Sequence, residues 1–136
     1  MLYFIKPQEM PLKGSSQLVT KPMLYDITLR SKNDSVAFCL TIYTKEPVEL
    51  QTVQVNTHDG MITSQPLEKI YVGIEKKHFK GRYRFYTTKQ QIESMYGSAT
   101  PFEVDFGKGI IFSNAKGKWA KESNAYKTIL QLASMN

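Results

Sequence analysis

The stretch Lys76–Lys89, KKHFKGRYRFYTTK, decides the fold because its charge and its alternation set it apart from the rest of the chain. It holds six of the 18 basic residues and none of the 12 acidic residues, so the net charge of +6 is concentrated here. Over residues 79–87, aromatic and small residues alternate with Lys80, Arg82 and Arg84. Side chains that alternate with a period of two lie on opposite faces of a β-strand. The stretch therefore predicts a strand with one aromatic face and one cationic face.

Similar patterns on both sides of this stretch predict a protein built mainly of strands. Alternating or continuously apolar runs occupy residues 23–30, 36–44, 48–57, 61–64, 67–75, 100–106 and 110–113. Polar, turn-forming residues separate these runs. At Asp59-Gly60 we expect a type I′ turn that joins Val53–Thr57 to Met61–Ser64, because both central positions of that turn need positive φ. Val36–Thr44 begins with residues that are apolar on both faces, which favours a central place in a sheet.

Two segments carry helical patterns instead. Thr88-Lys89-Gln90-Gln91 has the form of a capping box and Gly97 follows, so we predict a short helix at about 89–96. The apolar spacing after residue 125 predicts a C-terminal helix at about 124–134. Residues 1–22 hold three prolines. We expect them to form an irregular N-terminal arm with one short strand at Leu2–Ile5, followed by a single β-rich domain over 23–136.

Strands joined by hairpin turns, without alternating strands and helices, favour antiparallel pairing. We therefore predict a mainly β fold, an antiparallel β-sandwich or partly open barrel of about seven or eight strands. A chain of 136 residues is long enough to bury such a core without disulfides or metals.

Composition also bounds cofactors and compartment. The single cysteine, Cys39, excludes an internal disulfide, and its apolar neighbours predict that it is buried and unreactive. A reducing compartment such as the cytoplasm is slightly favoured, although an exported domain with a trimmed signal has the same composition. The two histidines are isolated and no phosphate-binding or metal-binding motif occurs, so we expect no metal and no cofactor. No run is apolar enough to span a membrane as a helix. The oligomeric state is open.

The cationic strand face is the best candidate binding surface. Small barrels that bind single-stranded nucleic acid combine cations with stacking aromatic rings. Here only Tyr86 shares the cationic face, because the other rings alternate onto the face that a core requires. The simpler interpretation of the pattern is therefore buried aromatics under a solvated or ion-paired basic face. The candidate anion-binding residues are Lys76, Lys77, Lys80, Arg82, Arg84, Tyr86 and Lys89.

Glu103 and Asp105 form a carboxylate pair two residues apart on one face of a predicted strand. Paired carboxylates carry out general acid–base catalysis or hold a divalent cation. Neither a histidine nor a third carboxylate lies beside them in the sequence. Cross-strand ion pairs with the 79–87 strand are the simpler interpretation of both residues.

We therefore expect a non-catalytic binding or interaction domain whose basic strand face contacts an anionic partner, either another protein or an anionic polymer. The alternatives are a sequence-tolerant nucleic-acid-binding module and a hydrolase-like enzyme that uses the carboxylate pair. The binding hypotheses need Lys80, Arg82 and Arg84 exposed and unpaired. The enzyme hypothesis needs Glu103 and Asp105 in a pocket.

Overall fold

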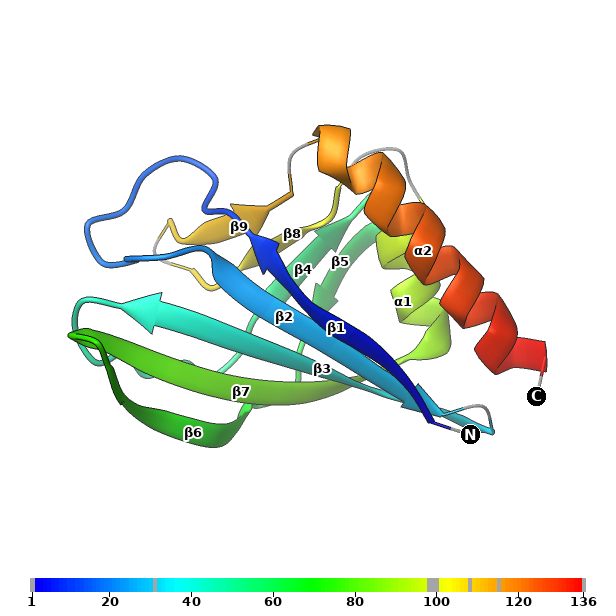
Figure 1. Cartoon of the computed structure of the whole chain (residues 1–136), viewed down its shortest axis with the longest axis horizontal. Helices are drawn as coiled ribbons and strands as arrows, with labels where there is room; N and C mark the ends of the chain where they lie inside the picture. Colours follow the sequence, from blue (N-terminus) through cyan, green and yellow to red (C-terminus); the bar gives the residue numbers. More distant parts are fainter. Residues whose placement is uncertain (1, 31, 98–100, 108, 115, 136) are drawn as a thin grey trace.

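A computed structural model describes residues 2–30, 32–97, 101–107, 109–114 and 116–135. Within these residues the chain forms two antiparallel sheets, with strand orders β1-β2-β3-β7-β6 and β5-β4-β8-β9, together with two helices (Figure 1). This confirms the predicted mainly β, sandwich-like fold. The elements are β1 (Leu2–Met10), β2 (Met23–Arg30), β3 (Asn33–Thr44), β4 (Gln54–Thr57), β5 (Gly60–Thr63), β6 (Glu68–Glu75), β7 (His78–Thr88), α1 (Lys89–Tyr96), β8 (Glu103–Asp105), β9 (Ile111–Ser113) and α2 (Lys116–Met135).

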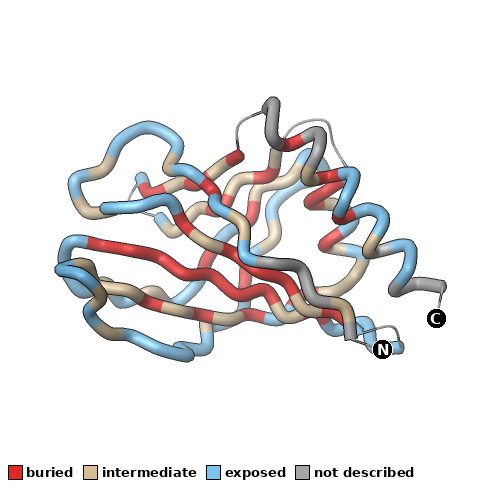
Figure 2. The backbone as a smooth tube through the Cα atoms, in the orientation of Figure 1, coloured by how far each residue is buried: buried red, intermediate tan, exposed pale blue. Residues whose placement is uncertain are grey.

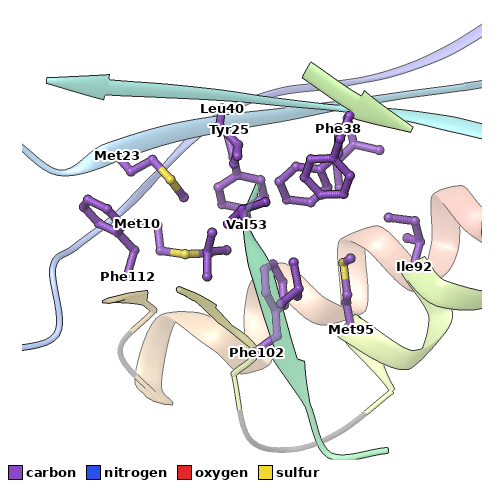
Figure 3. Close-up of a cluster of buried hydrophobic side chains, with 14 of the residues drawn as sticks. Met10, Met23, Tyr25, Phe38, Leu40, Val53, Ile92, Met95, Phe102 and Phe112 are labelled. Carbon is purple, nitrogen blue, oxygen red and sulfur yellow. The ribbon is translucent and has the colours of Figure 1, made fainter. Parts of the chain in front are cut away.

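The central position predicted for Val36–Thr44 is confirmed. β3 pairs with β2 on one side and with β7 on the other, and buried residues run along its length (Figure 2). Phe38 lies opposite Phe85 of β7 and their rings stack with centroids 5.1 Å apart. Tyr25, Phe38 and Phe102 point toward one another between the two sheets (Figure 3). This aromatic cluster joins the sheets, because Phe102 comes from the segment that leads into β8.

The first strand is longer than predicted. β1 extends to Met10 rather than ending at Ile5, and it pairs with β2 along its length. Pro7 is tolerated because it falls at an irregularity in the β1–β2 ladder between Ile5 and Gln8. No backbone N–H is required for pairing at such a position, so the missing N–H of proline costs little. The segment after β1 is also docked, since Leu12 bridges to Phe112 of β9.

The hairpin between β4 and β5 is confirmed, but its predicted register is wrong. Thr57 pairs with Gly60, so the two central residues of the turn are His58 and Asp59. Thr57 Oγ1 accepts a hydrogen bond from Asp59 N at 3.2 Å and donates one to Gly60 O at 3.0 Å. The threonine side chain thus closes the turn one residue earlier than the Asp59-Gly60 signal indicates.

Both predicted helices are present. In α1 the Thr88 and Gln91 capping box is confirmed, and Ile92, Met95 and Tyr96 are buried. α2 begins at Lys116 rather than near residue 124, because Trp119 is 1% exposed and stacks on Tyr96 with centroids 5.2 Å apart. This buried indole anchors the first turns of α2, a segment whose polar sequence predicts a loop.

Cys39 is buried as predicted, and burial raises the pKa of its thiol. It lies on the outer face of the five-stranded sheet, directly opposite Arg84 of β7. Because the thiolate is the reactive form, we expect slow labelling of the native protein by a thiol reagent. Labelling as fast as that of the urea-unfolded chain would contradict the structure around β3.

Three tyrosines place hydroxyl groups inside the core. Tyr96 donates a hydrogen bond to Tyr25 at 3.4 Å, and the Tyr96 and Tyr126 rings stack with centroids 4.1 Å apart. The Tyr126 hydroxyl has no hydrogen bond of acceptable geometry within the described residues. Burial raises the pKa of Tyr96 and of Tyr126 well above the ordinary value of 10.0.

We expect these hydroxyls to cause alkaline unfolding. Because burial raises the folded-state pKa above the unfolded-state pKa, the stabilisation is complete below about pH 10 and is lost as the pH rises further. The substitution Tyr126→Phe should make this decline shallower and leave the free energy of unfolding at pH 7 within about 1 kcal/mol of wild type. Urea titrations at pH 7 and pH 11 measure both effects. A loss above about 2 kcal/mol at pH 7 would show that the hydroxyl has a partner.

Candidate functional site

β7 presents the two faces that its alternation predicts. Tyr83 and Phe85 are buried on the inner face, while Lys80, Arg82 and Arg84 lie on the outer face with side chains between 29% and 34% exposed. β7 can do this because it lies between β3 and β6 in the five-stranded sheet. Its inner face therefore packs against the core, and its outer face looks away from the second sheet.

Arg82 forms an ion pair that crosses three strands. It lies opposite Thr41 of β3, and its guanidinium reaches over that strand to Asp26 of β2. The Nη1–Oδ2 distance is 3.0 Å and the Nη2–Oδ1 distance is 3.3 Å, so the contact is bidentate. Asp26 is only 3% exposed, and a carboxylate that is this buried needs a cation beside it. We infer that Arg82 serves mainly to neutralise Asp26.

The other two cations of the row pair with acids at the two ends of β6. Arg84 contacts Glu68 through Nη2–Oε1 at 2.7 Å and Nε–Oε2 at 3.2 Å. Lys80 Nζ lies 2.9 Å from Oε2 of Glu75, and this hydrogen bond lowers the pKa of that carboxyl group. All three cations of the row therefore have a carboxylate partner.

Tyr86 and Lys89 lie toward the far end of β7. Tyr86 is 52% exposed, and the guanidinium of Arg84 lies 5.4 Å from its ring centroid. Lys89 is the first residue of α1. At about 3.3 Å per strand residue, Lys89 and Lys77 are separated by roughly 40 Å. The seven sequence candidates therefore do not form one site.

Lys76 and Lys77 are the two candidates at the near end, and their backbone is unusual. They form the two-residue turn between Glu75 and His78, with φ of 48° and 71°. Both are exposed, and neither forms an ion pair within the described residues. Two successive residues with positive φ are the geometry of a type I′ turn, which favours Asn and Gly. Nothing in the sequence at this point signals such a turn.

A third lysine joins them from a distant part of the chain. Lys21 Nζ lies 5.0 Å from the ring centroid of Tyr43, and Lys80 Nζ lies 5.8 Å from the same centroid. The pKa of Glu75 is lowered first by Lys80 and then, through longer-range attraction, by Lys21 and Lys76. We refer to this end of the sheet as the basic tip, defined by Lys21, Lys76, Lys77 and Lys80.

Sequence reasoning missed Lys21 and Asp26 because their neighbours are distant in the chain. Lys21 approaches the tip only because its loop is held there: Thr20 N donates to Tyr43 O at 3.1 Å, and Thr20 Oγ1 lies 2.9 Å from His78 Nδ1. Asp26 meets Arg82 only because β2 and β7 flank β3. Neither contact has a local signal in the sequence.

Glu103 and Asp105 lie on β8 in the other sheet, so the prediction that they pair with the cations of β7 is wrong. Glu103 pairs with a lysine from the segment after β1, and Asp105 has a partner within its own turn. Glu103 forms an ion pair with Lys13, and Asp105 Oδ1 accepts a hydrogen bond from Gly107 N at 2.7 Å. Neither carboxylate lines a shallow depression on β4, β5 and α1, which is about 170 Å³ in volume. The described residues hold no cluster of three or more metal-ligating side chains.

Comparisons of the chain with protein-family models, with curated proteins and with solved structures find no match. In the part of the chain that the structure describes, neither helix is long and apolar enough to cross a membrane.

The ion pairs of the row should contribute unequally to stability. Replacing Arg82 by Met leaves the buried Asp26 carboxylate without its cation, and we expect a loss of about 2–3 kcal/mol in the free energy of unfolding. Arg84→Met breaks a more exposed pair and should cost at most about 1 kcal/mol. Asp26→Asn in the Arg82→Met background should restore part of the loss. Urea unfolding measures all three variants, and equal losses for the two arginine variants would contradict this assignment.

Proposed function

We propose that this chain is a non-catalytic binding domain that contacts an anionic partner through the basic tip. The observation that carries the proposal is the pair Lys76 and Lys77, which have positive φ at the end of the β6–β7 hairpin and form no ion pair with any residue that the structure describes. Lys80, Arg82 and Arg84 of the predicted basic face support the hairpin through their own ion pairs. The contact surface is therefore the end of the hairpin rather than its outer face.

The backbone at the tip argues for a role beyond folding. A left-handed conformation costs an L-amino acid with a side chain roughly 1–2 kcal/mol per residue. Asn-Gly would form the same turn at a lower cost. Strained residues persist at functional sites when the side chains that carry the strain are needed. Two exposed lysines held at such a turn fit a surface that binds anions, because their ammonium groups extend beyond the sheet into solvent.

The chemistry of the tip favours an acidic protein segment as the partner. Binding of single-stranded nucleic acid needs aromatic rings on which bases stack. Tyr43 at the tip is 8% exposed, and the exposed rings of Tyr71 and Tyr86 lie beside the ion-paired Arg82 and Arg84 rather than beside the tip lysines. The cations that could follow a phosphate backbone along the strand are already paired with carboxylates. Flexible lysines at a hairpin end instead suit carboxylates presented in no fixed geometry.

Two double substitutions at the tip separate charge from strain. Lys76→Gln with Lys77→Gln removes both charges and keeps the strain. Lys76→Asn with Lys77→Gly removes both charges and relieves the strain. We expect both variants to bind a fluorescent polyglutamate peptide at least about fivefold more weakly at 50 mM salt. Only the Asn-Gly variant should gain stability, by about 1–2 kcal/mol in urea unfolding.

The matched control is Lys32→Gln with Lys127→Gln, which removes the same two charges from exposed positions away from the tip. Its affinity should stay within about twofold of wild type, since net charge alone acts weakly across more than a Debye length. Equal weakening in the control and in the tip variants would refute a local site. A single-stranded oligonucleotide that binds more tightly than polyglutamate, and that depends on Arg84 and Tyr86, would favour the nucleic-acid alternative.

A further inference from the structure

His78 is the first residue of β7, and its ring contacts the loop that carries Lys21. It follows Lys77 directly and pairs with Glu75 across the hairpin. Nδ1 of the ring lies 2.9 Å from Oγ1 of Thr20, within hydrogen-bond distance, and the residue is half-buried. The loop before β2 and the β6–β7 turn therefore meet at this ring, at one end of the five-stranded sheet (Figure 1).

The position of the Thr20 hydroxyl is set by the backbone of its loop. Thr20 N donates a hydrogen bond to Tyr43 O at 3.1 Å, and the preceding residue, Val19, bridges to Thr44. The threonine thus presents a fixed partner to one ring nitrogen of His78. The other nitrogen, Nε2, forms no hydrogen bond with any residue that the structure describes.

The charges around the ring are mostly positive. Glu75, the acid opposite His78, is already paired with Lys80, whose Nζ lies 2.9 Å from its carboxylate. The described charged and titratable residues on the elements around the ring are Lys76, Lys77, Lys80 and Glu75 on the hairpin, Lys21 on the loop, Tyr43 on β3, and Lys45 and Glu46 after β3. A proton on His78 adds a positive charge to a surface on which cations already outnumber acids.

We propose that His78 joins the lysines of the basic tip as an additional cation when an anion binds there, so that binding takes up a proton. This inference rests on the proposed function, because it concerns the same surface. A bound anion stabilises the protonated ring through the attraction between opposite charges. By thermodynamic reciprocity, protonation of the ring strengthens anion binding by the same factor. The bound state holds more protons than the free state, so affinity rises as the pH falls.

The contact with Thr20 suits both charge states of the ring. A hydroxyl can donate a hydrogen bond to an unprotonated Nδ1 and accept one from a protonated Nδ1. His78 therefore keeps its place at the tip when it gains a proton, and Nε2 offers its N–H to the anion. A unit charge about 5 Å from an anion in water strengthens binding roughly three- to fivefold at low salt.

The experiment measures binding of a fluorescent oligomer of cysteic acid, whose sulfonates stay ionised, so that only the protein titrates. Affinity is compared at about pH 5.5 and about pH 8, a range in which histidine is the side chain that ordinarily changes charge. The wild-type chain should bind at least about threefold more tightly at the lower pH. His78→Gln should bind equally at both pH values, as weakly as the wild type at the higher one. His78→Lys, which stays charged, should bind at both as tightly as the wild type at the lower one.

The matched control is His58→Gln, because the chain has two histidines and His58 lies on the β4–β5 turn in the other sheet. Its pH profile should match that of the wild type. Titration calorimetry in two buffers of different ionisation enthalpy provides a second readout. At about pH 6.5 it should detect the uptake of a fraction of one proton per wild-type chain and none in His78→Gln. Circular dichroism at each pH confirms that the variants are folded.

The outcomes separate this inference from the proposed function. If Lys76→Gln with Lys77→Gln binds the oligomer as tightly as the wild type does, both are overturned. If that variant binds more weakly but His78→Gln keeps the wild-type pH profile, the coupling alone is overturned and the tip remains the binding site. A pH profile that is lost in His58→Gln instead would assign the proton to the β4–β5 turn and overturn the coupling as well.

Discussion

The contact between Arg82 and Asp26 is the constraint on which the basic strand depends. Asp26 lies on the central part of β2 with 3% of its surface exposed, and its carboxylate is satisfied by a guanidinium that reaches across β3. This bond ties β2, β3 and β7 together on the outer face, while stacked aromatic rings hold the same strands on the inner face. The buried carboxylate of Asp26 thus requires Arg82, one of the three cations that the sequence predicts to form a binding surface.

Much of the fold follows from local pattern. The alternation over residues 79–87, the apolar start of β3 and the capping box at Thr88 each depend on near neighbours in the chain, and the structure has all three. Local pattern does not predict contacts between segments that are distant in the sequence. The long β1 and the early start of α2 exist because β2 and Tyr96 support them, and neither support is visible in the local sequence.

The same distinction applies to the candidate site. All three cations of the row were predicted to lie on one face, and they do. Their partners depend on strand order, which local patterns do not determine. Glu68 and Glu75 meet the row because β6 folds back on β7, and Asp26 meets it because β2 is two strands away. The type I′ turn at Lys76 and Lys77 could not be predicted because lysine is not a residue that favours positive φ.

Lys76 and Lys77, which form no ion pair within the described residues, consequently lie at one end of the sheet rather than along β7. β6 carries the two acids that neutralise Arg84 and Lys80, leads into the strained turn and exposes its apolar edge. One strand therefore supports the basic face and positions the tip lysines.

We propose that anions contact the end of the β6–β7 hairpin and not its outer face. Amide chemical-shift mapping during titration with polyglutamate tests this directly, because each backbone N–H reports its own surroundings. We expect the largest shifts at Lys76, Lys77 and His78, with a smaller response at Lys21, and almost none at Arg84 or Tyr86. Shifts concentrated at Arg84 and Tyr86, with the turn unaffected, would contradict the account.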